Sequence, residues 1–136
     1  MIKLLKDVMP LCGLDEEEMW PDCCNMNLYE DGGAASAWRA DDEALFQGKL
    51  FDILVISLAL GATRKFELRC NQPQEGEKNA YTMTPMSGDL LTREGMVQKH
   101  MQHRVPVENS VQGATINLTW RWILKHRPQC PSIRNR

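Results

Sequence analysis

The sequence predicts a mostly β domain of the sandwich or jelly-roll type with one short helix at its N-terminus. Several segments alternate between unlike residues, as strands with two different faces do. The clearest are residues 24–29, 63–69 and 115–124. Turn-forming residues recur about every ten positions between such segments, a spacing typical of all-β folds. Little of the remaining sequence has the period of a helix, and no internal repeat is present.

The N-terminal segment carries the one clear helical pattern. Residues 2–14 place their apolar side chains on one face of a helix. Pro10 should break or kink this helix because proline lacks an amide hydrogen, and Gly13 is a plausible end. The acidic residues that follow predict a loop or a short helical turn. Residues 1–22 are therefore expected to form an N-terminal helix and an acidic loop.

The first half of the domain contains three predicted strands. Residues 24–29 put Asn25, Asn27 and Tyr29 on one side, which predicts a polar inner face. The apolar run 51–60 fits a strand or a buried helix, and its β-branched residues favour a strand buried on both faces. With Gly61 between them, residues 51–60 and 63–69 are predicted to form a hairpin.

The second half continues with short strands at 81–84, 89–92 and 103–105, and a longer one at 115–124. A turn or short helix is expected over 94–100.

Composition excludes several classes of protein. A chain of 136 residues makes one domain, and its formal charge of −2 gives no overall attraction to nucleic acid. The five cysteines show no zinc-finger spacing, so we interpret them as reduced thiols of an intracellular protein. The N-terminus does not resemble a signal peptide, and no apolar run approaches a membrane span. We expect a nuclear or cytoplasmic protein.

Two residues suggest a site for a metal-bound acid. His103 lies in a strand-like context and Arg121 on a later strand. If both face inward, the imidazole could hold a metal ion and the guanidinium could bind a carboxylate such as that of 2-oxoglutarate. The pattern alone is weak, because an isolated histidine is more often structural than a ligand.

The surrounding motifs make the pattern more specific. The string GDLL…EG…QHRVP…INLTWR, together with Asn27-Leu28-Tyr29 and WRADDE at 38–43, resembles the AlkB-like Fe(II)/2-oxoglutarate dioxygenases. The resemblance covers roughly residues 23–124 and does not include the family's usual N-terminal part, which supplies a lid. It implies a double-stranded β-helix, Fe(II) and 2-oxoglutarate as cofactors, and oxidative demethylation of alkylated bases in DNA or RNA.

The resemblance also implies the metal ligands, with one departure. Asp41 and His103 match two of the three residues that hold iron in the family. The third position should be histidine and is Arg39. A guanidinium is always protonated and only donates hydrogen bonds, so it cannot ligate a cation. We predict that Arg39 instead pairs with Asp41, the alternative being that Arg39 points to solvent.

The co-substrate positions are likewise partly kept. Asn27, Tyr29, Asn117 and Arg121 match residues that hold 2-oxoglutarate in the family. A second arginine that should clamp its far carboxylate is replaced by Thr115. One clamp is therefore kept and the other is lost.

Three interpretations of the function remain open. The chain is an impaired demethylase, a non-catalytic relic or binding module, or a fragment of a larger gene. By resemblance, Asp42 and Glu43 lie at the substrate mouth. Residues 125–136 form a basic tail that we expect to be loosely held and to carry whatever weak nucleic-acid affinity exists.

Overall fold

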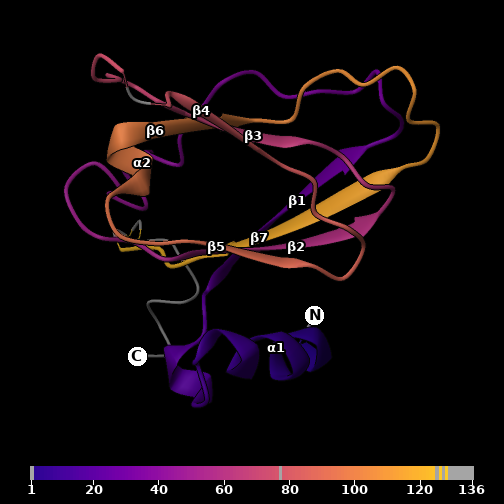
Figure 1. The fold of residues 1–136 in the computed structure, drawn as a ribbon. Helices are drawn as coiled ribbons and strands as arrows, with labels where there is room; N and C mark the ends of the chain where they lie inside the picture. The colour runs from indigo at the N-terminus through magenta and orange to yellow at the C-terminus, as the bar shows by residue number, and fades with distance from the viewer. Residues whose placement is uncertain (1, 77, 125, 127, 129–136) are drawn as a thin grey trace.

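Antiparallel strands dominate the computed structural model, which describes residues 2–76, 78–124, 126 and 128. Two sheets face each other, and the N-terminal helix lies outside them, beyond the larger sheet (Figure 1). This arrangement is the jelly roll, or double-stranded β-helix, and it confirms the predicted fold class and the short N-terminal helix. The predictions for residues 125, 127 and 129–136 concern positions outside the described residues.

Each sheet is antiparallel throughout its described strands. The larger sheet has the order β1-β7-β2-β5 and the smaller one the order β4-β3-β6. The strands of the larger sheet are β1 (Cys23–Tyr29), β7 (Thr115–Arg121), β2 (Val55–Gly61) and β5 (Leu90–Arg93). Those of the smaller sheet are β4 (Ala80–Met83), β3 (Phe66–Cys70) and β6 (Met101–Arg104).

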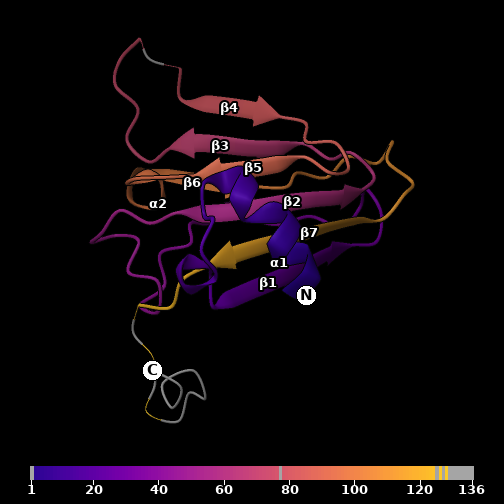
Figure 2. The same ribbon diagram turned by 90° about the horizontal axis from the view of Figure 1, so that it is seen from below.

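The apolar core lies on the outer face of the larger sheet. Helix α1 (Ile2–Val8) and the 3₁₀ turn η1 (Pro10–Cys12) pack there, as the view from below shows (Figure 2). The helix stops before Pro10, and Gly13 closes the turn in the left-handed region with φ 75°, as predicted. The cluster consists of Val8, Met9, Leu14, Ile56, Leu58, Leu118 and Trp120.

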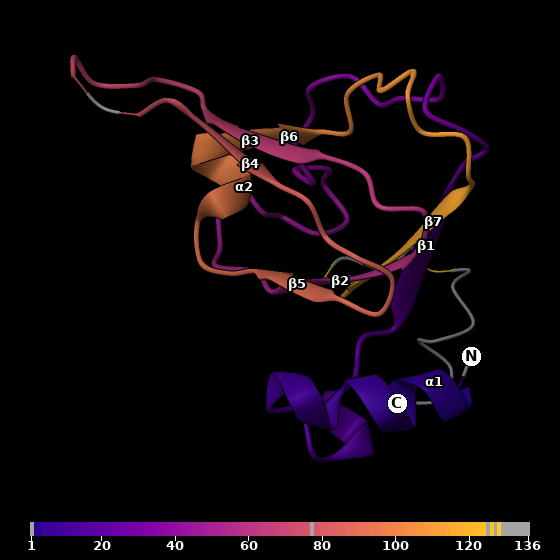
Figure 3. The same cartoon turned by 45° about the vertical axis from the view of Figure 1, so that its right-hand side comes forward.

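The inner face of the same sheet is polar, and it looks toward the smaller sheet (Figure 3). Successive residues of a strand point to opposite faces, so every second residue of β1, β2 and β7 is available there. The predicted polar inner face of the first strand is confirmed, because Asn25, Asn27 and Tyr29 all line a cavity between the sheets. The alternation of polar and apolar residues along these strands thus gives the sheet one apolar face and one polar face.

One detail of the apolar run differs from prediction. Strand β2 begins at Val55 instead of residue 51, because Ile53 and Leu54 line an apolar groove outside the sheet. The part that is strand is internal to the sheet and almost wholly buried, as expected.

The predicted hairpin between residues 51–60 and 63–69 is wrong. β2 pairs with β5 and β7, whereas β3 pairs with β4 and β6 in the other sheet. Gly61 has φ 87°, and a Cβ there would lie 2.3 Å from the carbonyl oxygen of Ala114. The glycine therefore marks a crossing between sheets and not a tight turn within one.

The shorter elements agree with the sequence. Helix α2 (Val97–His100) lies between β5 and β6, and η2 (Glu17–Met19) lies in the acidic loop. Cys12, Cys23, Cys24 and Cys70 are free thiols. Across the described part of the chain, no helix has the length and apolarity needed to cross a membrane.

Candidate functional site

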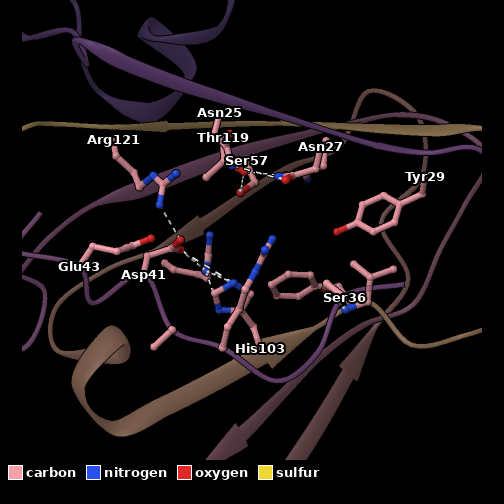
Figure 4. Close-up of a pocket in the computed structure, with 16 residues that line it drawn as sticks. Asn25, Asn27, Tyr29, Ser36, Asp41, Glu43, Ser57, His103, Thr119 and Arg121 are labelled. Atoms are coloured by element: carbon pink, nitrogen blue, oxygen red, sulfur yellow. Dashed lines mark hydrogen bonds and ion pairs between the residues drawn. The ribbon is translucent and has the colours of Figure 1, made fainter. Parts of the chain in front are cut away.

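A polar cavity of about 90 Å³ opens between the two sheets (Figure 4). Inward-facing residues of β1, β2 and β7 form one wall. Arg39 and Asp41 line the same cavity from the segment between β1 and β2. Arg93 reaches it from β5, and His103 from β6. The structure thus brings together residues far apart in the sequence, including both predicted metal ligands.

Asp41 lies at the centre of a buried ionic network. Its side chain accepts a hydrogen bond from Arg121 Nη1 at 2.6 Å on Oδ1 and from Arg93 Nη1 at 2.9 Å on Oδ2. All three residues are less than a tenth exposed. Both carboxylate oxygens are therefore bonded to guanidinium groups, and one anion faces two cations.

The backbone around Asp41 is fixed from the side of α2. Its amide donates a hydrogen bond of 2.9 Å to Oε1 of Gln98, which is 1% exposed. Gly48 packs against both residues, since a Cβ at that position would lie 2.9 Å from the Asp41 carbonyl oxygen and 3.0 Å from Gln98 Cβ. Close packing at this point holds Asp41 within reach of both arginines.

His103 is buried on β6 and stacks on Phe66, with ring centroids 5.5 Å apart. Its Nδ1 lies 3.0 Å from Arg93 Nη1, and its Nε2 lies 3.9 Å from Asp41 Oδ2. Burial, followed by the charge of Arg93, lowers the pKa of His103 from 6.5 to about 4. The imidazole is therefore neutral at pH 7, and a neutral ring nitrogen can accept the hydrogen bond from Arg93.

Arg93 is a site residue that the sequence analysis missed. Its guanidinium contacts both Asp41 and His103 and lies over the Phe66 ring, 5.6 Å from the centroid. Burial lowers the pKa of Arg93, and the charge of Asp41 opposes that shift. Arg93 pairs with Val55 of β2, which is wholly buried. This pairing exists only in the folded protein, so the sequence carried no signal that Arg93 would be buried.

Arg39 does not form the predicted pair with Asp41. Among the described residues, the ion partners of Asp41 are Arg93, Arg121 and, at longer range, His103. Arg39 bonds to His103 through its backbone, at 3.0 and 2.8 Å, while its side chain is exposed at the cavity. The prediction failed because Arg93 and Arg121 already occupy both carboxylate oxygens.

The four predicted co-substrate residues all line the cavity, namely Asn27, Tyr29, Asn117 and Arg121. The hydroxyl of Thr115 donates a hydrogen bond of 2.6 Å to the carbonyl of Ala62. Thr115 itself carries no positive charge, and it lines a small neighbouring pocket together with Arg64 and Lys65.

The two predicted substrate-contacting residues differ in their surroundings. Asp42 forms an ion pair of 2.8 Å with Lys49 and is partly exposed. Glu43 is exposed and lines the cavity. Only Glu43 is thus placed where it could meet a molecule that enters the cavity.

The residues present do not fit a divalent metal ion. No group of three or more His, Cys, Asp and Glu side chains could hold a metal within the described ranges. Asp41 and His103 lie close together, but an arginine contacts both, and Arg39 has no electron pair to offer a cation. Three arginines line the same cavity and disfavour a further positive charge.

Curated relatives resemble this chain over most of its length. A human protein, "Alpha-ketoglutarate-dependent dioxygenase alkB homolog 3", is 38% identical over 103 residues, which cover 71% of this chain and 35% of that protein. The Arabidopsis thaliana protein "DNA oxidative demethylase ALKBH2" is 27% identical over 118 residues, covering 73% and 37%. The chain therefore spans about a third of the length of these relatives.

A solved structure, that of OsALKBH1, has the same fold. It matches with a TM-score of 0.59 and 21% identity, covering 88% of this chain and 63% of that one. A comparison with protein-family models found no match. The motifs, the jelly roll and the relatives agree, and we conclude that the chain belongs to the AlkB-like dioxygenase family.

Proposed function

We propose that this chain is an AlkB-like Fe(II)/2-oxoglutarate dioxygenase domain in which the family reaction, oxidative demethylation of alkylated bases in DNA or RNA, is impaired. The relatives support the reaction class, since their names describe a 2-oxoglutarate-dependent dioxygenase and a DNA oxidative demethylase. Alkylated nucleic acid is the proposed partner, and the nucleus or cytoplasm the proposed location.

One observation carries the impairment: the donor set around Asp41 and His103. Iron in a 2-oxoglutarate oxygenase needs a facial set of two histidines and one carboxylate. Here Arg39 takes the place of one histidine, and its exposed side chain cannot bind a cation. Thr115, bonded to Ala62, removes the second carboxylate clamp. Both changes act against turnover.

A second candidate function is a binding module without catalysis. The observation that favours it is the network of Arg93, Asp41 and Arg121, which neutralises the buried carboxylate without a metal ion. An empty metal site usually leaves its acidic ligand unpaired, at a cost to stability. This chain needs no metal to hold its fold in that region.

The test is metal content together with succinate formation. Purified protein is incubated anaerobically with Fe(II) or Mn(II), desalted and analysed for metal. It is then supplied with Fe(II), 2-oxoglutarate and a methylated oligonucleotide. We expect less than stoichiometric metal and no succinate above background, with the human relative as a positive control. Stoichiometric iron and turnover would show that the reaction is intact and would refute the impairment.

A further inference from the structure

The space between Asp41 and His103 contains a side chain. Arg93 Nη1 lies 2.9 Å from Asp41 Oδ2 and 3.0 Å from His103 Nδ1. The two side chains are themselves close, because Asp41 Oδ2 lies 3.9 Å from His103 Nε2, the other ring nitrogen, which is 3.4 Å from Arg93 Nη1. A metal ion binds imidazole nitrogen and carboxylate oxygen at roughly 2.0–2.2 Å, so an ion shared by these two side chains would need the space next to Nη1.

We propose that the Arg93 guanidinium occupies the cation position of this pocket, so that the chain supplies its own positive charge between Asp41 and His103 and excludes a divalent metal. This inference deepens the proposed function and rests on it. Neither the motifs nor the relatives assign a role to Arg93. If Arg93 occupies the cation position, the exposed Arg39 is not the residue that fills the site.

The surroundings of Arg93 favour a fixed position. Its side chain is 5% exposed, and its guanidinium lies over the ring of Phe66. Its Nε is buried without a hydrogen-bond partner among the described residues. A buried guanidinium with an unsatisfied nitrogen depends on its remaining contacts, and Asp41 is its anion. Leaving the site would separate that pair.

The charge balance opposes a metal ion for a second reason. Arg121 bonds the other oxygen of Asp41 at 2.6 Å, so the carboxylate is fully shared by two guanidinium groups. A divalent ion would face both of them at short range and would have to displace one. Restoring a histidine at position 39 adds a ligand but leaves Arg93 in place. Arg39→His alone should therefore fail to create a metal site.

Metal titration of a small set of variants tests the proposal. The set is wild type, Arg39→His, Arg93→Met, and the double variant Arg39→His/Arg93→Met. Methionine keeps much of the length of arginine without its charge. The matched control is Arg39→His/Arg69→Met, because Arg69 is an exposed arginine whose one polar side-chain partner among the described residues is Gln102. Mn(II) alone is the probe, and free Mn(II) is measured by electron paramagnetic resonance.

We expect the double variant to bind one Mn(II) at least about tenfold more tightly than Arg39→His, the size of effect that residues around a metal commonly have. The Arg69 control should bind no more tightly than Arg39→His. Equal binding by Arg39→His and the folded double variant, whether tight or absent, would overturn the proposal. Turnover by the wild type would refute the proposed impairment and the exclusion of metal together, whereas equal Mn(II) binding without turnover would refute the role of Arg93 alone, so the two failures are distinguishable.

A metal-free measurement covers the case in which the double variant does not fold. The urea midpoint is measured for wild type, Asp41→Asn, Arg93→Met and Asp41→Asn/Arg93→Met. If Arg93 is bound to Asp41, Asp41→Asn should lower the midpoint more in the wild-type background than in the Arg93→Met background. Equal losses in the two backgrounds would show that the two residues are not coupled and would overturn the proposal.

Discussion

A single carboxylate balances two guanidinium groups in the interior of this domain. Asp41 is 8% exposed and is bonded to Arg93 and Arg121 on separate oxygens. In an iron site that holds no metal, removing the acidic ligand would remove a buried carboxylate that has no counter-ion, and this should stabilise the fold. Here it would leave two buried cations without a counter-ion, so the two kinds of site respond oppositely to the same substitution.

Asp41→Ala should therefore lower the free energy of unfolding by about 3–5 kcal/mol in the absence of metal. Urea denaturation followed by circular dichroism measures it. The control is Asp42→Ala, because Asp42 and Lys49 form a partly exposed pair whose loss should cost under about 1 kcal/mol. An Asp41→Ala variant as stable as the wild type would contradict the network.

His103 should give the domain a dependence on acid pH. Its pKa is about 4 in the folded protein and 6.5 when unperturbed, so between these values the unfolded chain binds more protons. The contribution is fully present above pH 6.5 and is lost as the pH falls through 4. Denaturation midpoints measured from pH 7 to pH 4 should show it.

Two substitutions separate this effect from the titration of carboxylates. His103→Gln should flatten the midpoint profile between pH 6.5 and 4, apart from any constant loss of stability. His100→Gln changes an exposed histidine and should leave the profile unaltered. A profile that His103→Gln does not flatten would assign the acid sensitivity to other groups.

At the scale of elements, Arg64 joins the turn that follows β1 to the loop that follows β6. Arg64 precedes β3 and donates to the backbone carbonyls of Asp31 at 2.7 Å, Ala34 at 2.8 Å and Pro106 at 2.7 Å. It also pairs with Glu108 at 3.3 Å and is 3% exposed. The side chain of Arg64 thus joins the turn after β1 to the loop after β6, in addition to backbone hydrogen bonds such as that from Glu108 to Gly32.

Arg64→Met should cost about 3–5 kcal/mol of unfolding free energy, because it leaves three part-buried carbonyls without this donor and removes one of the cations that pair with Glu108. The measurement is again urea denaturation. Arg69→Met, an exposed change of the same chemistry, is the control and should cost under about 1 kcal/mol. Similar losses for the two variants would mean that the loops hold without Arg64.

Across the whole molecule, charge is distributed so that nucleic-acid binding depends on local patches. The formal charge is −2, while the segment 125–136, outside the described residues except for 126 and 128, is basic. Phosphate contacts made by such a segment are sensitive to salt but not to sequence.

Removal of residues 125–136 should abolish whatever affinity the chain has for a methylated oligonucleotide, because it deletes Lys125, Arg127, Arg134 and Arg136. Fluorescence anisotropy at low salt and at physiological salt measures the loss. A matched variant with those four residues changed to glutamine keeps the chain length and should behave in the same way. Undiminished binding by the truncated protein would assign recognition to the cavity.

The sequence alone determined the alternation of the strands, the break of the first helix before Pro10, and the polar inner face that carries Asn27 and Tyr29. These features follow from local periodicity and backbone chemistry, which neighbouring residues set. The motif around His103 and Arg121 also identified two members of the cavity before any fold was known. Burial of Arg121 and His103 agrees with that prediction.

Only the tertiary structure decided which residues meet. The partner of strand 63–69 depends on the crossing at Gly61, and the partners of Asp41 depend on the register that places Arg93 opposite buried Val55. Nothing in the surrounding string LLTREG distinguishes Arg93 from an arginine on the protein surface. Its burial is set by contacts 52 residues away, with Asp41, and local patterns contain no information about such long-range pairing.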